Sequence, residues 1–481
     1  MWMGQVTSTT DSIAPRSTDT YWSVPTELLR KYDQPGPRYT SYPTVPVWTE
    51  EFGPAQYEEH LRRFAATDRA LSVYVHLPFC HERCTFCGCN VVIAQRQETV
   101  ERCLDYLFRE IDHVTEQLGP RRRVLQLSWG GGTPTFLTIP QIDRLWKKLN
   151  QAFTIDPTAE VAIEVDPRVT TPEQMRHLRA LGFNRLSMGV QDLDPEVQTA
   201  IGRGQTFAQT EATYELGREL GFTGINMDLI YGLPRQTVPE FSETIAAVAR
   251  WLPDRLAVYS YAHVPWVRPQ QMQINEAELP TGSEKFALFA AAVEGLLAAG
   301  YHPIGMDHFA LPTDELAAGL GNGRLHRNFM GYTVSASRDM VGLGVSSIGE
   351  IAGCFAQNDS RLGGYYRRLD TSGFGIQRGW ALTRDDEIRR EAILSIMCRL
   401  RLSVAELSDR FGIDAAAYLA EEMTRLDEFI NDGLLEPTHD GFIVTPTGRH
   451  FVRNIAMVFD AYLPRLTEQA TAKRPIFSRT I

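Results

Sequence analysis

Six short runs rich in β-branched and aromatic residues recur between about residues 70 and 265, separated by segments with helical periodicity. The runs are LSVYVHLP (71–78), VLQLSW (124–129), EVAIEV (160–165), RLSMGV (185–190), GINMDLIYG (224–232) and RLAVYSYAH (255–263). Strands that alternate with helices at this spacing predict βαβ units and a parallel sheet buried on both faces. Six units predict an α/β fold built on a partial (β/α)6 TIM-like barrel, rather than a closed barrel of eight.

Polar or reactive residues stand at or near the end of every run. A cysteine-rich loop follows the first run, GGGTPT follows the second, and the later runs carry Glu164 and Asp166, Gln191 and Asp192, Asp228, and His263. The C-terminal ends of barrel strands open onto one face, and that face carries the chemistry. We therefore expect the functional site there, in a barrel at 70–265 that is extended by residues 266–375.

After about residue 380 the pattern of alternating strands and helices ends. Helical segments, a hairpin (LLEPTHDGFIVTPTG) and a last helix (RHFVRNIAMVFDAYL) predict a winged-helix-like domain at 380–481. Between Ser403 and Leu434 there are eight acidic residues and two arginines. A recognition helix with this charge would repel phosphates, so we expect a cap or docking domain rather than a DNA-binding one. Residues 1–27 are predicted to be a disordered lead-in, and 28–69 a segment that packs near the active site.

The overall composition favours small-molecule chemistry. A formal net charge of −11 argues against binding to nucleic acid or to an anionic membrane, because both need a basic surface. No stretch approaches the roughly 20 apolar residues of a membrane span, and the N-terminus has no apolar signal core. The expected location is the cytoplasm.

Four of the seven cysteines lie within ten residues, CHERCTFCGC, at positions 80, 84, 87 and 89. An odd cysteine count without an export signal indicates metal binding rather than disulfides. Only Gly88 separates Cys87 from Cys89, so three ligands and one bystander are easier to arrange than four ligands around one ion. An iron–sulfur cube held by three thiolates leaves one iron open, as catalysis requires, and a zinc knuckle is the alternative.

The spacing of Cys80, Cys84 and Cys87 fits C-x3-C-x2-C, the motif of radical S-adenosylmethionine (SAM) enzymes, whose fold is a partial βα barrel. The flanking sequence resembles the oxygen-independent coproporphyrinogen III oxidase (dehydrogenase) family of haem biosynthesis across about residues 28–481. The motifs that carry the resemblance are VYVHLPFCHERCTFCGCN, PRYTSYPT, GGGTPT, EVDPR, RLSMGVQD, DLIYGLP, GMDHFA, LHRNF-GYT and FSRTI.

The resemblance implies that Cys80, Cys84 and Cys87 hold one 4Fe-4S cluster, whose fourth iron binds SAM. A 5′-deoxyadenosyl radical then removes a hydrogen from a propionate of coproporphyrinogen III, carbon dioxide leaves, and a vinyl group forms. Two propionates react, which gives protoporphyrinogen IX. The resemblance also implies a reductant such as flavodoxin or ferredoxin, a terminal electron acceptor that the sequence does not identify, and a monomeric enzyme.

Family positions match two sets of residues around two SAM molecules. Tyr74, Gly131, Glu164 and Ile348 are expected at the first, and Phe86, Gly132, Thr133, Gln191, Arg203, Asp228 and Ala262 at the second. Each has a structural alternative: the glycine run as a turn, Asp228 as a helix cap, Arg203 as a surface ion-pair partner. Cys89 is expected to stand beside the cluster in a catalytic role, on a loop that Gly88 lets turn sharply, or alternatively only to pack there.

Four further positions concern the substrate. The family usually has glutamine where this chain has Met330, and a thioether cannot replace the two donors and the carbonyl of glutamine in any contact with cofactor or substrate. Arg38, Arg327 and Arg479 are candidates for a cationic rim around the substrate carboxylates, with exposed loop arginines as the alternative.

A haem chaperone with the same cluster is the rival function, although such relatives typically lack Cys89 and the YTSYP segment. The isolated Cys103, Cys354 and Cys398 are expected to be buried apolar residues.

Overall fold

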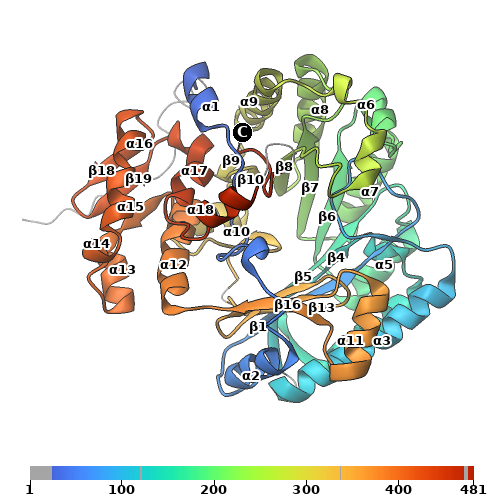
Figure 1. The fold of residues 1–481 in the computed structure, drawn as a ribbon. Coiled ribbons are helices and arrows are strands. Elements are labelled where there is room, and N and C mark those ends of the chain that lie inside the picture. The colour runs from blue at the N-terminus through green and yellow to red at the C-terminus, as the bar shows by residue number, and fades with distance from the viewer. Residues whose placement is uncertain (1–23, 120–121, 336, 471–474, 481) are drawn as a thin grey trace, which may run out of the picture.

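The computed structural model describes residues 24–119, 122–335, 337–470 and 475–480. Its centre is a curved twelve-stranded sheet in the order β16-β15-β14-β13-β1-β4-β5-β6-β7-β8-β10-β9 (Figure 1). The six predicted strands are confirmed as neighbours, all parallel: β1 (Leu71–Leu77), β4 (Arg122–Gly131), β5 (Phe153–Val165), β6 (Arg185–Gln191), β7 (Gly224–Tyr231) and β8 (Arg255–Ser260).

Further strands extend the sheet at both edges. Next to β1 stand β13 (Met340–Leu343), which is parallel to it, and the antiparallel β14 (Ile348–Ile351), β15 (Cys354–Asn358) and β16 (Ile376–Ala381). Next to β8 stand the antiparallel β10 (His308–Ala310) and β9 (His302–Gly305). The sheet therefore continues beyond the six parallel strands without closing into a ring of eight βα units.

Helices cover the outer face of the sheet (Figure 1). They are α2 (Pro54–Ala65), α3 (Gln97–Leu118), α4 (Ile139–Ala152), α5 (Pro172–Leu181), α6 (Pro195–Ala200), α7 (Phe207–Glu219), α8 (Val238–Trp251), α9 (Gly282–Ala298) and α11 (Leu362–Ser372). Helix α10 (Glu315–Gly321) instead packs beside β9, on the side of the C-terminal region (Figure 1). Strand β1 is buried at six of its seven positions, because these helices pack behind it and other chain segments lie in front. This is why its sequence is a nearly continuous apolar run.

The C-terminal region is mostly helical, as predicted. It comprises α12 (Arg384–Arg399), β17 (Arg401–Ser403), α13 (Val404–Phe411), α14 (Ala415–Tyr418), α15 (Ala420–Arg425), α16 (Asp427–Asn431), β18 (Leu435–Thr438), β19 (Gly441–Val444), α17 (Val452–Met457) and α18 (Leu463–Gln469). The predicted hairpin is confirmed as β18 and β19, which pair antiparallel. The prediction of one continuous last helix is wrong. The Asp460 carboxylate accepts hydrogen bonds from the backbone N–H groups of Tyr462 (2.9 Å) and Leu463 (3.1 Å), which starts α18 separately.

The N-terminal segment packs against the C-terminal region. Helix α1 (Thr26–Tyr32) begins two residues inside the predicted lead-in, most of which lies outside the described residues. The Tyr32 ring stacks on Phe429 with 5.0 Å between centroids, and Pro35 forms an antiparallel bridge with Arg479. Residues that are 397 and 444 positions apart in the sequence thus lie side by side next to the barrel (Figure 1).

Candidate active site

The cysteine-rich loop leaves the C-terminal end of β1, where the sequence predicted it. The short parallel strands β2 (Phe79–Cys80) and β3 (Val92–Ile93) hold its two ends together. Cys80 Sγ lies 3.5 Å from Thr133 Oγ1. Buried Cys84 accepts weak hydrogen bonds from Arg203 Nη1 (3.9 Å) and Arg168 Nη2 (3.8 Å). Two guanidiniums therefore lie beside one sulfur.

Cys87 and Cys89 form a directly interacting pair. A hydrogen bond from the Cys89 thiol lowers the pKa of Cys87 to about 6, and the same contact raises the pKa of Cys89 well above its usual value. The Cys89 backbone N–H also points at Cys87 Sγ, at 3.4 Å. At neutral pH, Cys87 is therefore the thiolate and Cys89 the thiol.

The donor set fits an iron–sulfur cluster better than a single metal ion. Among the described residues, no three His, Cys, Asp or Glu side chains are spaced to hold one ion, as a zinc knuckle requires. A cubane distributes its thiolates over separate irons, so its ligands stand further apart. Burial raises the pKa of Cys80 to about 11, and this proton would leave when the thiol coordinates iron.

Gly88 does not have the role that the sequence predicted. Its φ lies outside the left-handed range, and a Cβ built on it would meet nothing within 4 Å. The loop turns here without needing glycine. The positions that do require glycine are those of the run at the C-terminal end of β4.

The glycines at 130–132 are required by close packing on three sides. A Cβ on Gly130 would lie 2.5 Å from the Glu164 carboxylate, and one on Gly131 (φ +118°) would lie 2.7 Å from the His76 ring. A Cβ on Gly132 would lie 2.6 Å from the Pro78 carbonyl, directly before the cysteine loop. The run is therefore more than a turn, because it lets the end of β4 approach the loop and the barrel interior.

A cavity of about 660 Å³ opens inside the barrel beside these glycines. Its lining includes Tyr74, Glu164 and Ile348 from the first predicted SAM set, together with Asp228 from the second. Gly131, the fourth member of the first set, donates its backbone N–H to Glu164 Oε2 (3.0 Å). The barrel walls partly desolvate Glu164 and raise its pKa to about 7.

The second predicted set surrounds the cysteine loop in a looser arrangement. Gln191 ends β6 in a left-handed conformation (φ +69°), and Thr133 contacts Cys80. Gln271 donates to the carbonyls of both Phe86 (3.0 Å) and Ala262 (3.2 Å), which ties the loop after β8 to the cysteine loop. The structure brings both sets to one end of the sheet, and their binding roles stay predictions.

Two structural alternatives can be judged from the same contacts. Asp228 lies within β7, so it is not a helix cap, and it accepts a hydrogen bond from Asn226 Nδ2 (2.8 Å). Burial raises its pKa. Arg203 does form an ion pair, with Asp166 at 3.5 Å, but its side chain is 7% exposed and is not on the surface.

Sequence reasoning missed His76 and Arg168. Tyr74 Oη donates to His76 Nδ1 (3.1 Å), whose Nε2–H donates to the Asn90 carbonyl (3.1 Å). Burial lowers the pKa of His76 to about 4, so the ring is neutral. Arg168 pairs with Asp166 at 2.8 Å. Both residues stand inside the quoted motifs VYVHLPF and EVDPR, which was the available signal.

The three arginines predicted to form a cationic rim lie in different environments. Arg327 is 4% exposed, Arg38 is partly buried against Asp307, and only Arg479 matches the exposed alternative, at 60% side-chain exposure. Met330 lines the barrel cavity, so the missing glutamine does change the polarity of its wall. The isolated Cys103, Cys354 and Cys398 are buried, as expected.

Comparison with known proteins agrees with this geometry. The profile described as "Radical SAM superfamily" matches residues 74–248, and that described as "HemN C-terminal domain" matches 382–451. The oxygen-independent coproporphyrinogen III oxidase of Escherichia coli (strain K12) is 45% identical over 454 residues, which cover 94% of this chain and 98% of that protein. The protein of the same name from a Synechocystis species is 41% identical over 459 residues, or 95% and 97% of the two chains.

A solved structure shows the same architecture. The coproporphyrinogen III oxidase (HemN) from Escherichia coli, described as a radical SAM enzyme, superposes with a TM-score of 0.87 at 43% identity, covering 92% of this chain and 100% of that one. The barrel, the cysteine loop and the helical C-terminal region therefore form one shared fold. The protein belongs to the oxygen-independent coproporphyrinogen III oxidase family, a family of oxidoreductases within the radical SAM superfamily.

Proposed function

We propose that the chain converts two propionate side chains of coproporphyrinogen III to vinyl groups without oxygen, which yields protoporphyrinogen IX for haem synthesis. The observation that carries this proposal is the position of Cys80, Cys84 and Cys87 at the C-terminal end of the sheet. There they adjoin the cavity lined by Tyr74 and Glu164. When bound, a 4Fe-4S cluster and SAM supply the radical that removes a propionate hydrogen.

The chain's own residues position the cofactors. Cys80, Cys84 and Cys87 hold the cluster, with Arg168 and Arg203 donating hydrogen bonds to Cys84 Sγ. The glycine run lets backbone groups approach the first SAM. Neutral His76 orients the Tyr74 hydroxyl toward the same cavity wall, and Glu164 accepts hydrogen bonds from ribose hydroxyls.

A second SAM occupies the side of the site defined by the second residue set. Asp228 and Arg203 offer opposite charges there, which suits the hydroxyl and carboxylate groups of SAM. Support comes from the Gln271 contacts, which hold Phe86 and Ala262 in fixed positions relative to each other. Counting SAM molecules per chain by equilibrium dialysis, with the cluster loaded, distinguishes two sites from one.

The remaining assignments concern partners and location. The enzyme takes electrons from a flavodoxin- or ferredoxin-type reductant and acts as a cytoplasmic monomer. None of the helices in the described residues is long and apolar enough to cross a membrane. The acidic C-terminal region does not bind DNA, and a mobility-shift assay at low salt, where electrostatic binding is strongest, would expose the opposite result.

Anaerobic incubation with coproporphyrinogen III, SAM and a reductant tests the proposal, with vinyl-containing products as the expected result. A haem chaperone would instead bind haem and release no vinyl product. The relatives named as oxidases do not favour that rival, and this chain carries both Cys89 and the Tyr39–Pro43 segment. Absence of decarboxylated product from cluster-loaded protein that still cleaves SAM would refute the proposal.

A further inference from the structure

Four cationic side chains from four separate segments meet between the barrel and the C-terminal region. Arg38 comes from the N-terminal segment, Lys285 from the first turns of α9, Arg327 from β11 (His326–Asn328) and Arg453 from α17. Burial, together with nearby Arg38 and Arg327, lowers the pKa of Arg453 to about 9. Burial, Arg453 and Arg38 lower the pKa of Lys285 to about 8 against the opposing effect of Asp33. The four charges therefore lie within range of one another.

This cation cluster has little negative charge to balance it. Within the described residues, Asp307 is the one carboxylate that forms an ion pair with any of the four, and its partner is Arg38. The Arg453 guanidinium donates its hydrogen bonds to backbone carbonyls, including those of Pro37 (3.0 Å) and Arg479 (2.9 Å). Lys285 donates to the Tyr261 carbonyl at 2.8 Å. Clustered buried cations without counter-charges cost stability unless an anion joins them.

Arg327 gives the clearest indication of a missing anion. Its Nε and Nη1 atoms are buried and find no hydrogen-bond partner among the described residues. Its guanidinium carbon lies 4.7 Å from the centre of the Tyr332 ring, and Tyr332 lines the barrel cavity. A buried guanidinium with free N–H groups is suited to a carboxylate, which it can bind in a bidentate manner.

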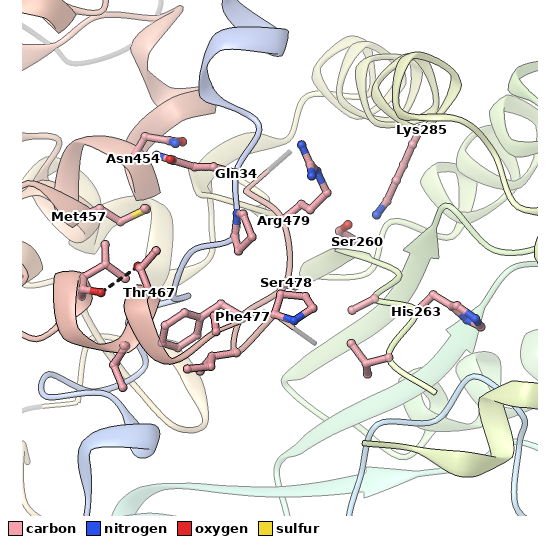
Figure 2. Close-up of a pocket in the computed structure, with 18 of the residues that line it drawn as sticks. Gln34, Ser260, His263, Lys285, Asn454, Met457, Thr467, Phe477, Ser478 and Arg479 are labelled. Atoms are coloured by element: carbon pink, nitrogen blue, oxygen red, sulfur yellow. Dashed lines mark hydrogen bonds between the residues drawn. The ribbon is translucent and has the colours of Figure 1, made fainter. Parts of the chain in front are cut away.

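The cluster also borders a larger cavity, of about 1130 Å³, between the barrel and the C-terminal region. Figure 2 shows the Lys285 side chain running from its helix toward Ser260, with Arg479 beside it. A small cavity lined by Arg38 and Arg453 shares Ser260 and Arg479 with the large one. Lys285 therefore lines the large cavity and Arg38 and Arg453 line the small one, whereas Arg327 is buried against Tyr332, which lines the barrel cavity.

We propose that this cluster binds the substrate carboxylates that are not reacting, with Arg38 and Arg327 holding one propionate and Lys285 another, while Arg453 adds fixed positive charge behind them. The inference rests on the proposed function, because it requires a macrocycle that carries several carboxylates. It assigns substrate recognition to residues remote from the cysteine loop. SAM binding and cluster loading should therefore be independent of them.

The test compares Lys285→Met and Arg327→Gln with Lys147→Met and Arg324→Gln, which alter exposed cations elsewhere on the surface. Each cluster variant should raise the KM for coproporphyrinogen III by about tenfold to a hundredfold, as expected for loss of a charge-assisted hydrogen bond. Iron content and substrate-free SAM cleavage should stay at wild-type levels. Arg327→Lys should recover part of the affinity, because it restores charge without the fork.

A binding titration with coproporphyrin III, an unreactive tetracarboxylate, separates this inference from the proposed function. Failure of the wild type to turn over coproporphyrinogen III would reject the function. If the wild type turns over and both cluster variants keep wild-type KM and porphyrin affinity, the inference is overturned. Should Arg327→Gln not fold, as judged by circular dichroism and iron content, Lys285→Met with its matched control decides alone.

Discussion

Two cysteines separated by one residue have opposite protonation states in this loop. Cys89 keeps its proton and donates it toward Cys87, whose thiolate is stabilised in return. A thiolate can bind iron without first losing a proton, whereas a thiol such as Cys80 or Cys89 must release one. The difference is consistent with the prediction that Cys87 is a ligand and that Cys89 stands beside the cluster.

Serine substitutions distinguish these roles. Changing Cys80, Cys84 or Cys87 should abolish cluster binding and SAM cleavage, because a cubane held by two thiolates is not retained. Cys89→Ser should keep close to about four irons per chain, the content of one such cluster, but lose most propionate decarboxylation. Iron analysis and product quantification check both statements. A cluster lost in Cys89→Ser would make Cys89 a ligand, and full turnover would leave it without a catalytic part.

The raised pKa of Glu164 leads us to expect that SAM binding depends on pH. Its raised pKa, about 7, means that the carboxyl group is largely protonated below pH 7 and charged above it. The charged form accepts hydrogen bonds from hydroxyls more strongly, so SAM affinity should rise between pH 6 and pH 8. Glu164→Gln should bind SAM about tenfold more weakly and show a flat profile over that range. Calorimetric titration of cluster-loaded protein measures both, and an unchanged slope in the variant would contradict the assignment.

At the scale of elements, the C-terminal end of β4 is the segment with the least room for change. Gly132 faces the Pro78 carbonyl, and Pro78 precedes the first cysteine by two residues. A displacement of β4 would therefore move the loop that carries all three ligands. Packing at a strand end thus controls the geometry of a site several residues away.

Gly132→Ala tests that coupling. The added methyl group should force the strand or the loop to shift, costing about 1–3 kcal/mol of unfolding free energy and lowering iron content after reconstitution. Gly88→Ala is the matched control inside the loop itself, because its methyl would meet open space without left-handed strain. Urea denaturation of the apo protein and iron analysis provide the readouts. Equal behaviour of the two variants would show that the close contact at Gly132 is unimportant.

The same elements show how far the sequence could lead. The six parallel strands were predictable because each is an apolar or β-branched run between helical segments, although only β1 is buried nearly throughout, whereas β6 and β7 alternate between buried and partly exposed positions. Strands such as β13 (Met340–Leu343) were not, since four residues carry too little pattern to separate from a loop. The spacing of the cysteines was enough to predict candidate ligands, whereas Lys285 and Arg453 lie in helical sequence with no distinctive motif. Only the folded chain brings them together with Arg38, so no local pattern could reveal the cation cluster.

At the scale of the whole molecule, Arg453 joins the two ends of the described chain. Its guanidinium donates to the carbonyls of Gly36 and Pro37 on one side and of Ser478 and Arg479 on the other. Thr480 continues the junction by donating to the Tyr32 carbonyl at 2.7 Å. The N-terminal segment that carries Arg38 is thereby fixed against α17 and the C-terminal residues 478–480.

Arg453→Met should release this junction. Several buried carbonyls would lose their donor, so the free energy of unfolding should fall by about 3 kcal/mol or more, even though repulsion among the cations decreases. Arg465→Met, on the exposed face of α18, serves as the control. Guanidinium denaturation of the two variants measures the difference. Equal midpoints would show that the carbonyl contacts of Arg453 contribute nothing to the stability of the fold.

The pairing of Tyr32 with Thr480 spans 448 positions, and it has a consequence for the order of assembly. Contacts of such separation form late, because the chain between their ends must already be compact. During synthesis, the barrel and its cysteine loop are complete before residues 478–480 are translated, so a nascent chain has its cluster ligands before the N-terminal segment can be fastened. We therefore expect a newly made chain to become competent for iron–sulfur loading first and for porphyrinogen binding only afterwards.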